Sequence, residues 1–231
     1  MKNLKSFKGM KNQQSGFTLV EIAIVLVIIG LLLGGILKGQ ELINSAKVKA
    51  MVNDMKLVAT QVYGYQDRFK AMPGDDPRAN TNLAGATVAT TPAASLANGR
   101  IEGAWNSITT TDESFLFWQH VRFANLATGT TDTTATDYRP LNSENGNLGI
   151  TSAAILTAPT TPFNGSFFVC QGNINGRFAR QIDTTMDDGN PATGSVRIIV
   201  GNNAATAADA TTTAAMTLAG DGAVYTVCAA F

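Results

Sequence analysis

The chain has 231 residues, with 17 basic and 17 acidic side chains and a formal net charge of zero. That length suits one domain, or one domain with an appendage. The low share of charged residues, 15%, and the absence of a clustered basic run after residue 16 argue against a nucleic-acid partner. The Thr-rich composition favours an extracellular β-rich fold over a cytosolic enzyme.

The N-terminal segment carries the most uneven charge in the chain. Four lysines precede Gly16 and no acidic residue does: Lys2, Lys5, Lys8 and Lys11. A basic segment before an apolar run is typical of a secretory signal, or of a membrane anchor whose lysines stay in the cytoplasm. Removing residues 1–16 would leave a net acidic chain.

The apolar run extends from Phe17 to Leu37, which is roughly 32 Å as an α-helix and enough to span a bilayer. No A-x-A cleavage pattern ends it, unlike a secretory signal. An uncleaved membrane anchor explains the basic segment and the long apolar run, but not Glu21 or the Gly16–Phe17 junction. An acid inside hydrocarbon costs several kcal/mol unless it is paired. A cut after Gly16 would free an α-amine four residues before Glu21, and the amine of a neighbouring copy would be its natural partner.

Residues 16–21, GFTLVE, resemble the class III signal of type IV pilins and pseudopilins. The resemblance covers residues 1 to about 72 closely and the rest only in general plan. It implies that a prepilin peptidase cuts between Gly16 and Phe17, that Phe17 is then N-methylated, and that the subunit is extruded into a filament. Glu21 would set the register of each subunit against the Phe17 amine of another.

The resemblance also implies a location and partners. We expect a single-pass inner-membrane protein with its head in the periplasm, and a cell-surface or extracytoplasmic filament after assembly. The partners would be other pilin-like subunits, the prepilin peptidase, an inner-membrane assembly platform and membrane lipid. We expect no catalytic activity. The alternative is a single-span membrane protein that displays a binding domain without polymerising. A pilus and a type II secretion system both remain open.

A continuous helix is predicted from Phe17 to Ala71, about 80 Å long, ended by the sequence MPGD at 72–75. Beyond Leu37 its apolar residues recur at spacings of three, four or seven: Val48, Met51, Val52, Met55, Val58, Ala59, Val62, Tyr65 and Phe69. Four glycines in the first half, at 30, 34, 35 and 39, indicate either close helix packing in a membrane or a stretch that unwinds on assembly.

The chain therefore divides into four predicted segments. They are a basic leader at 1–16 that is removed, a transmembrane and filament-core helix at 17–37, an amphipathic helix at 38–72, and an extracytoplasmic head at 73–231. We expect an α+β fold of type IV pilin-like plan, in which the long helix packs on a C-terminal antiparallel sheet of about four strands.

Within the head, residues 73–111 read as a long connection with at most one short helix. A capping box formed by Thr110 and Glu113 predicts a short buried helix at 114–123, with Trp118 in the core. Strands are predicted at 166–171, 177–184, 196–200 and 223–228, with a turn at 187–191.

Two cysteines, Cys170 and Cys228, are the only ones in the chain. One pair in an exported protein usually forms one disulfide, and two separate buried thiols are the alternative. The single histidine, His120, has no Cys or Glu at metal-ligand spacing, so we expect a structural role.

Calcium is the one cofactor that the sequence raises, and otherwise we expect none. Asp183, Asp187 and Asp188, together with Asn190, offer oxygen ligands of the kind that hard cations prefer. A second acidic pair stands at 75–76. The spacing does not match a calcium-binding loop, and a plain turn explains it as well. Some pseudopilins bind calcium near the C-terminal sheet, which favours the metal.

Overall fold

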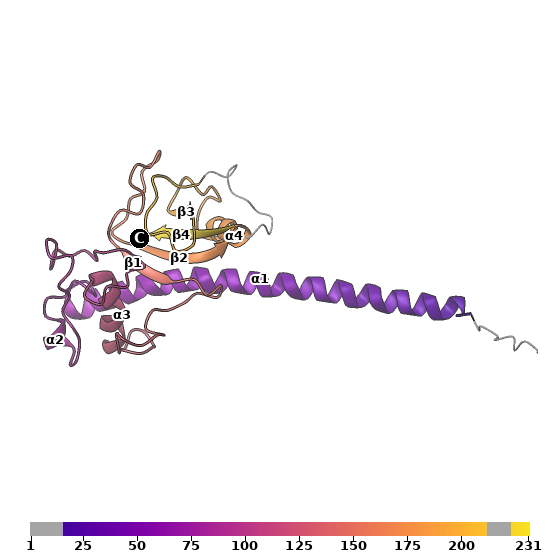
Figure 1. The fold of residues 1–231 in the computed structure, drawn as a ribbon, viewed down its shortest axis with the longest axis horizontal. Coiled ribbons are helices and arrows are strands. Elements are labelled where there is room, and N and C mark those ends of the chain that lie inside the picture. The colour runs from indigo at the N-terminus through magenta and orange to yellow at the C-terminus, as the bar shows by residue number, and fades with distance from the viewer. Residues whose placement is uncertain (1–15, 212–222) are drawn as a thin grey trace, which may run out of the picture. The chain divides into compact units, whose positions relative to one another are not determined.

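A computed structural model describes residues 16–211 and 223–231 (Figure 1). Residues 1–15 of the predicted leader, with its four lysines, lie outside the described residues. The chain divides into two compact units, one ending at Ile43 and one running from Asn44 to Phe231, which we call the head. Helix α1, Leu19–Phe69, contributes to both units, and its bounds confirm the predicted long helix within two residues at each end.

The first unit is helical from Leu19 onward. Its sequence consists mainly of aliphatic residues and contains no proline that would break the helix. Each large apolar side chain from Leu19 to Leu37 is exposed. By length and composition this helix can cross a membrane. A Cβ added at any of its glycines would meet no other atom within 4 Å, so in the isolated chain nothing requires glycine there.

The second half of α1 forms one wall of the head core. Its predicted apolar stripe is buried from Val48 to Tyr65, and Phe69 is partly buried. The side chain of Gln171 donates a hydrogen bond of 2.7 Å to the Met51 carbonyl, which joins the helix to the sheet. The helix ends where Lys70 adopts a left-handed backbone, with φ of 55°, three residues before the predicted proline stop.

Four antiparallel strands build the sheet, in the order β1-β2-β4-β3. They are β1 Leu148–Thr151, β2 Phe168–Asn175, β3 Val196–Val200 and β4 Val224–Ala230. The prediction of an α+β fold with a four-stranded antiparallel sheet is confirmed. The predicted strand at 196–200 has the observed bounds, the strands at 166–171 and 223–228 overlap β2 and β4, and β1 was not predicted.

The predicted strand at 177–184 is wrong, because this segment is helix α4, Gly176–Met186. The Asn175 side chain caps the helix by accepting a hydrogen bond of 3.0 Å from the Arg177 amide. Phe178 and Ile182, one helical turn apart, are both buried. Packing of this turn against β2, β3 and β4 outweighs the β-branched residues in the segment.

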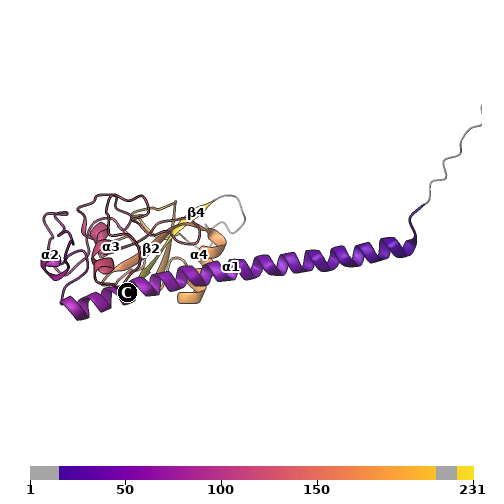
Figure 2. The ribbon, with the colours of Figure 1, turned by 90° about the horizontal axis from the view of Figure 1, so that it is seen from below.

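Helix α3, Glu113–Phe123, confirms the predicted short buried helix, and Trp118 is 5% exposed within the core. Its predicted capping box is wrong. The N-cap is Asp112 and not Thr110, and the Glu113 carboxylate turns inward to accept a hydrogen bond of 2.7 Å from the Glu102 amide. The connection before it contains one short helix, α2, Ala79–Asn82. In both views α3 and α4 lie apart along the head (Figures 1 and 2).

Candidate functional sites

The predicted processing junction lies just before α1, in residues that belong to no helix or strand. Gly16 and Phe17 both precede the first helical residue, Leu19. Phe17 is 84% exposed, and a Cβ built on Gly16 would meet nothing within 4 Å. No described residue therefore covers the peptide bond between Gly16 and Phe17, and an enzyme could reach it.

Glu21 has hydrogen-bond partners within its own chain, which were not predicted from the sequence. Its Oε2 accepts two hydrogen bonds of 2.8 Å, one from the backbone amide of Thr18 and one from the Thr18 hydroxyl. In return the Thr18 hydroxyl oxygen accepts a bond of 3.3 Å from the Glu21 amide. This reciprocal pattern is a capping box, T-x-x-E, which satisfies amides at the start of α1.

The capping box was missed although the T-x-x-E spacing stands in the sequence. It shows that Glu21 has a structural role at the start of its own helix. Its second oxygen, Oε1, accepts no hydrogen bond from the described residues, so one acceptor stays available for a further donor.

The two cysteines form a disulfide between β2 and β4, which confirms the pairing. Cys170 and Cys228 stand directly opposite each other in the strand register and are both fully buried. The bond closes a loop of 58 residues in sequence separation. It ties the C-terminal strand to the centre of the sheet.

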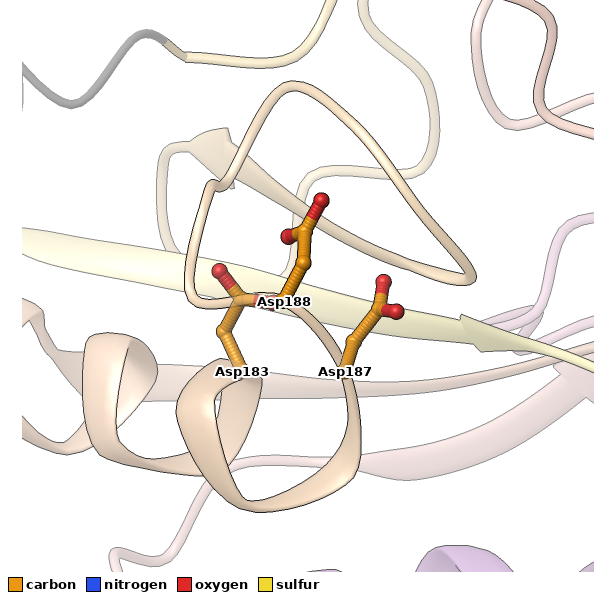
Figure 3. A group of neighbouring side chains, drawn as sticks. All are labelled: Asp183, Asp187 and Asp188. Atoms are coloured by element: carbon orange, nitrogen blue, oxygen red, sulfur yellow. The ribbon is translucent and has the colours of Figure 1, made fainter.

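The structure brings together the three acids that were predicted as calcium candidates (Figure 3). Asp183 lies in the last turns of α4, and Asp187 and Asp188 follow in the loop that leads to β3. One oxygen of each lies within 4.8 Å of one oxygen of the others. The loop is tight, because a Cβ at Gly194, whose φ is 70°, would lie 1.8 Å from an Asp187 oxygen.

Asp183 is the exceptional member of this cluster. It is completely buried, and neither carboxylate oxygen accepts a hydrogen bond of ordinary geometry from the described residues. Burial raises its pKa to about 7, and the charges of Asp188 and Asp187 add to the rise, while nearby Arg197 lowers it. The other two carboxylates each have a backbone donor: Asp187 accepts a hydrogen bond of 3.0 Å from the Val196 amide, and Asp188 accepts one of 2.8 Å from the Asn190 amide.

A buried carboxylate without donors is costly unless it is protonated or meets a cation. Three carboxylates around one position are the oxygen donor set that calcium prefers. The side-chain oxygen of Asn190 accepts a bond of 3.2 Å from the Ala192 amide.

The other acidic pair has a different role. Asp75 accepts hydrogen bonds from the amides of Ala97 and Gly99, and Asp76 accepts a bond of 2.9 Å from the Tyr65 hydroxyl. These carboxylates stabilise the connection after α1 and are not grouped around a cation position.

His120 is a structural residue, as expected. Its Nδ1 accepts a bond of 2.9 Å from the Gly74 amide, and its Nε2 lies 2.7 Å from the Thr87 carbonyl, to which it donates in the neutral form. Burial lowers its pKa, which favours this neutral form.

Comparison with known proteins decides what the N-terminal segment is. Residues 11–37 match the prokaryotic N-terminal methylation motif. This motif is the signature of type IV pilins and pseudopilins. It includes the Gly16–Phe17 junction, Glu21 and the apolar run to Leu37, so the predicted resemblance is confirmed for this segment. No curated protein and no solved structure matches the chain.

Proposed function

We propose that the chain is a structural subunit of a type IV pilus-like or type II secretion filament, as a pilin, a minor pilin or a pseudopilin. The observation that carries the proposal is a methylation motif followed by a helical stretch, Leu19 to Leu37, in which every large apolar side chain is exposed. Such a surface needs lipid or copies of the same helix to cover it.

In this proposal a prepilin peptidase cuts between Gly16 and Phe17, and Phe17 is N-methylated. The subunit waits in the inner membrane as a single-pass protein with its head in the periplasm. An assembly platform then extrudes it, with other pilin-like subunits, into an extracytoplasmic filament. The chain has no catalytic role of its own. The rival is a membrane-anchored binding protein that never polymerises.

Glu21 would act twice in this mechanism. Its Oε2 holds the Thr18 cap, and its free Oε1 would meet the Phe17 amine of another subunit. Because a charged pair in hydrocarbon is much stronger than the same pair in water, that contact would set the axial register between copies.

Two substitutions separate these roles. Glu21→Ala removes both the cap and the charge, and we expect it to leave processing and membrane insertion intact while blocking assembly. Glu21→Gln keeps an oxygen that can accept the capping bonds but removes the charge. Sheared surface fractions from producing cells would be probed for the subunit. Loss of filaments in both variants supports the pairing, whereas normal filaments from Glu21→Gln would show that the cap alone matters.

We also propose that Asp183, Asp187 and Asp188 bind calcium. The buried Asp183 carboxylate supports this, because neither of its oxygens has a hydrogen-bond partner among the described residues and a divalent ion would offset its charge. The ion would hold the end of α4 to the loop before β3 and so stabilise the head.

Calorimetry on the head fragment 44–231 tests the proposal, with millimolar calcium and with magnesium for comparison. We expect heat with calcium and none with Asp183→Asn. Asp132→Asn is the matched control, because Asp132 is exposed and its carboxylate accepts hydrogen bonds from the amide and hydroxyl of Thr134. Absence of heat from the parent head at millimolar calcium would end the calcium proposal and leave the filament proposal untouched.

A further inference from the structure

A cavity of about 470 Å³ opens on the head between α1, α3 and the segment that leads to β1. Its walls are mixed: Trp118 and Leu126 contribute apolar surface, and Asp54 and Gln61 contribute oxygen acceptors. Arg122 also lines the cavity, and its guanidinium group donates hydrogen bonds to the carbonyls of Thr128, Thr130 and Tyr138. Leu57 and Leu141 also line it, and they are 49% and 56% exposed. Exposing these two large apolar side chains to water at the rim of one cavity is unfavourable, and a partner that buries them would be stabilised.

Both acceptors lack donors. The Asp54 carboxylate makes no hydrogen bond or ion pair with the described residues, whose ion pairs involve other acids. Burial raises the pKa of its carboxyl group. Gln61 is 6% exposed and its Oε1 has no hydrogen-bond partner. The two stand seven residues apart, two helical turns or about 10 Å, on the same face of α1.

An unpaired cationic surface lies elsewhere on the same head. In α4, Arg177 is exposed and Arg180 is half-buried, and neither guanidinium group has a partner among the described residues. The acid of this helix, Asp183, is buried, so the exposed face of α4 carries positive charge only. Arg177 lies in the first turn, where the helix dipole disfavours cations, so helix stability does not account for its position.

The two surfaces belong to different parts of the head. The cavity lies beside α3, which contacts β1 at one edge of the sheet, whereas α4 packs on β2, β3 and β4. The helices stand apart in both views (Figures 1 and 2). When two different surfaces of one protein match each other, copies join head to tail, and such contacts extend into open helical polymers unless they close into a ring.

We propose that this cavity receives α4 of a second copy of the chain, with Arg177 pairing with Asp54 while Leu57 and Leu141 pack against the body of the incoming helix. The inference rests on the proposed filament function and adds a contact between heads to the packing of the apolar helices. Complementary charge favours this occupant, because it brings a cation to the Asp54 carboxylate, which makes no ion pair with the described residues, while the guanidinium group of Arg122 in the same cavity donates to backbone carbonyls.

Charge reversal in the full-length chain tests the contact, with sheared filaments from producing cells as the readout. Asp54→Lys and Arg177→Glu should each lower the filament yield about tenfold or more, since each places like charges at the contact. The double variant should restore the yield to within about twofold, because the pair is re-formed with reversed signs. Asp67→Lys, a reversal on the same helix at an exposed acid, is the matched control and should assemble normally.

A second measurement does not require that the head still folds when Asp54 is replaced. Leu141→Cys and Gln181→Cys, both at exposed positions, should form disulfide-linked multimers in filaments when combined in one chain, and neither alone should do so. Normal filaments from Asp54→Lys, no rescue in the double variant, or no cross-linking would each overturn the proposed contact. If the parent chain forms no filaments, the proposed function fails instead.

Discussion

From Leu19 to Leu37 every large apolar side chain of α1 is exposed, whereas from Val48 to Tyr65 the apolar stripe of the same helix is 0–6% exposed. The second stretch packs with α3 and the sheet in one core, whereas no described residue of the first unit covers the first stretch. The first unit therefore depends on its surroundings, lipid or other copies, and the head depends on its own sequence. Substitutions that act on one unit alone can test this division.

The largest expected effect comes from a charge placed in the first unit. Ile28→Asp, in the middle of the apolar run, should cost about 2.5–3.5 kcal/mol in membrane insertion and eliminate filaments. The melting temperature of the head should not change. Met55→Asp puts the same charge at a position that is 0% exposed, and should unfold the head.

Membrane fractionation and thermal unfolding of the purified variants distinguish the two outcomes. A head that unfolds in Ile28→Asp would contradict the independence of the two units.

Loss of the disulfide should weaken the head without unfolding it, and it should act on the head alone. In the chain-entropy model a loop of this length stabilises the fold by about 4 kcal/mol. Cys170→Ala combined with Cys228→Ala should therefore lower the free energy of unfolding of the fragment 44–231 by that order in denaturant titrations. Membrane anchoring of the full chain should be unaffected. A loss below about 1 kcal/mol would mean that the sheet holds β4 without the bond.

The acidic cluster predicts a pH dependence in the absence of calcium. Asp183 has a folded pKa of about 7 and an ordinary value of 3.8. The folded state therefore binds more protons than the unfolded state between these values, and stability must fall as pH rises through that window. Glu113, whose pKa burial raises to about 8, acts in the same direction.

In a chelator we expect the melting temperature of the head to drop by roughly 5 °C from pH 5 to pH 8. Calcium should reduce the drop, because it favours the ionised form of Asp183. Asp183→Asn should abolish the effect of calcium on the melting temperature. It should leave the part of the pH-dependent drop that is due to Glu113. A melting temperature that rises over this pH range would contradict the burial of both acids.

The smallest effect concerns the glycines of the first unit. Gly34→Ala should stabilise the helix by about 1 kcal/mol or less, and there is room for the methyl group in the isolated chain. Circular dichroism of the detergent-solubilised variant should show equal or higher helicity. Reduced filament yield would then show that assembly needs close packing or local unwinding at Gly34, and an unchanged yield would exclude both at this position.

The parts that sequence reasoning predicted have strong local signals. The apolar run, the 3.6-residue periodicity to Tyr65 and the junction at Gly16 are readable because each depends on neighbours in sequence. The capping box of Thr18 and Glu21 is equally local in sequence. It was not predicted, because Glu21 was interpreted only as a charged residue within the membrane-spanning segment.

The parts that were missed depend on contacts distant in sequence. Strand β1 contains Gly149, a residue that weakens a strand pattern, yet a Cβ there would lie 2.0 Å from the Trp105 carbonyl oxygen. Helix α4 forms because its apolar turn meets the sheet. The acidic residues of the candidate cation site were named from sequence, but the burial of Asp183 follows from α4 and so was not predictable.

The mass of the mature chain's N-terminal peptide is the most direct test of the central claim. The peptide would be recovered from the membrane and sheared fractions of producing cells. The account predicts that it begins at Phe17 and carries one N-methyl group, with residues 1–16 absent. A mature chain that retains the lysine leader, or that begins at any other residue, would remove the free amine on which the filament mechanism depends and would favour the non-polymerising membrane anchor.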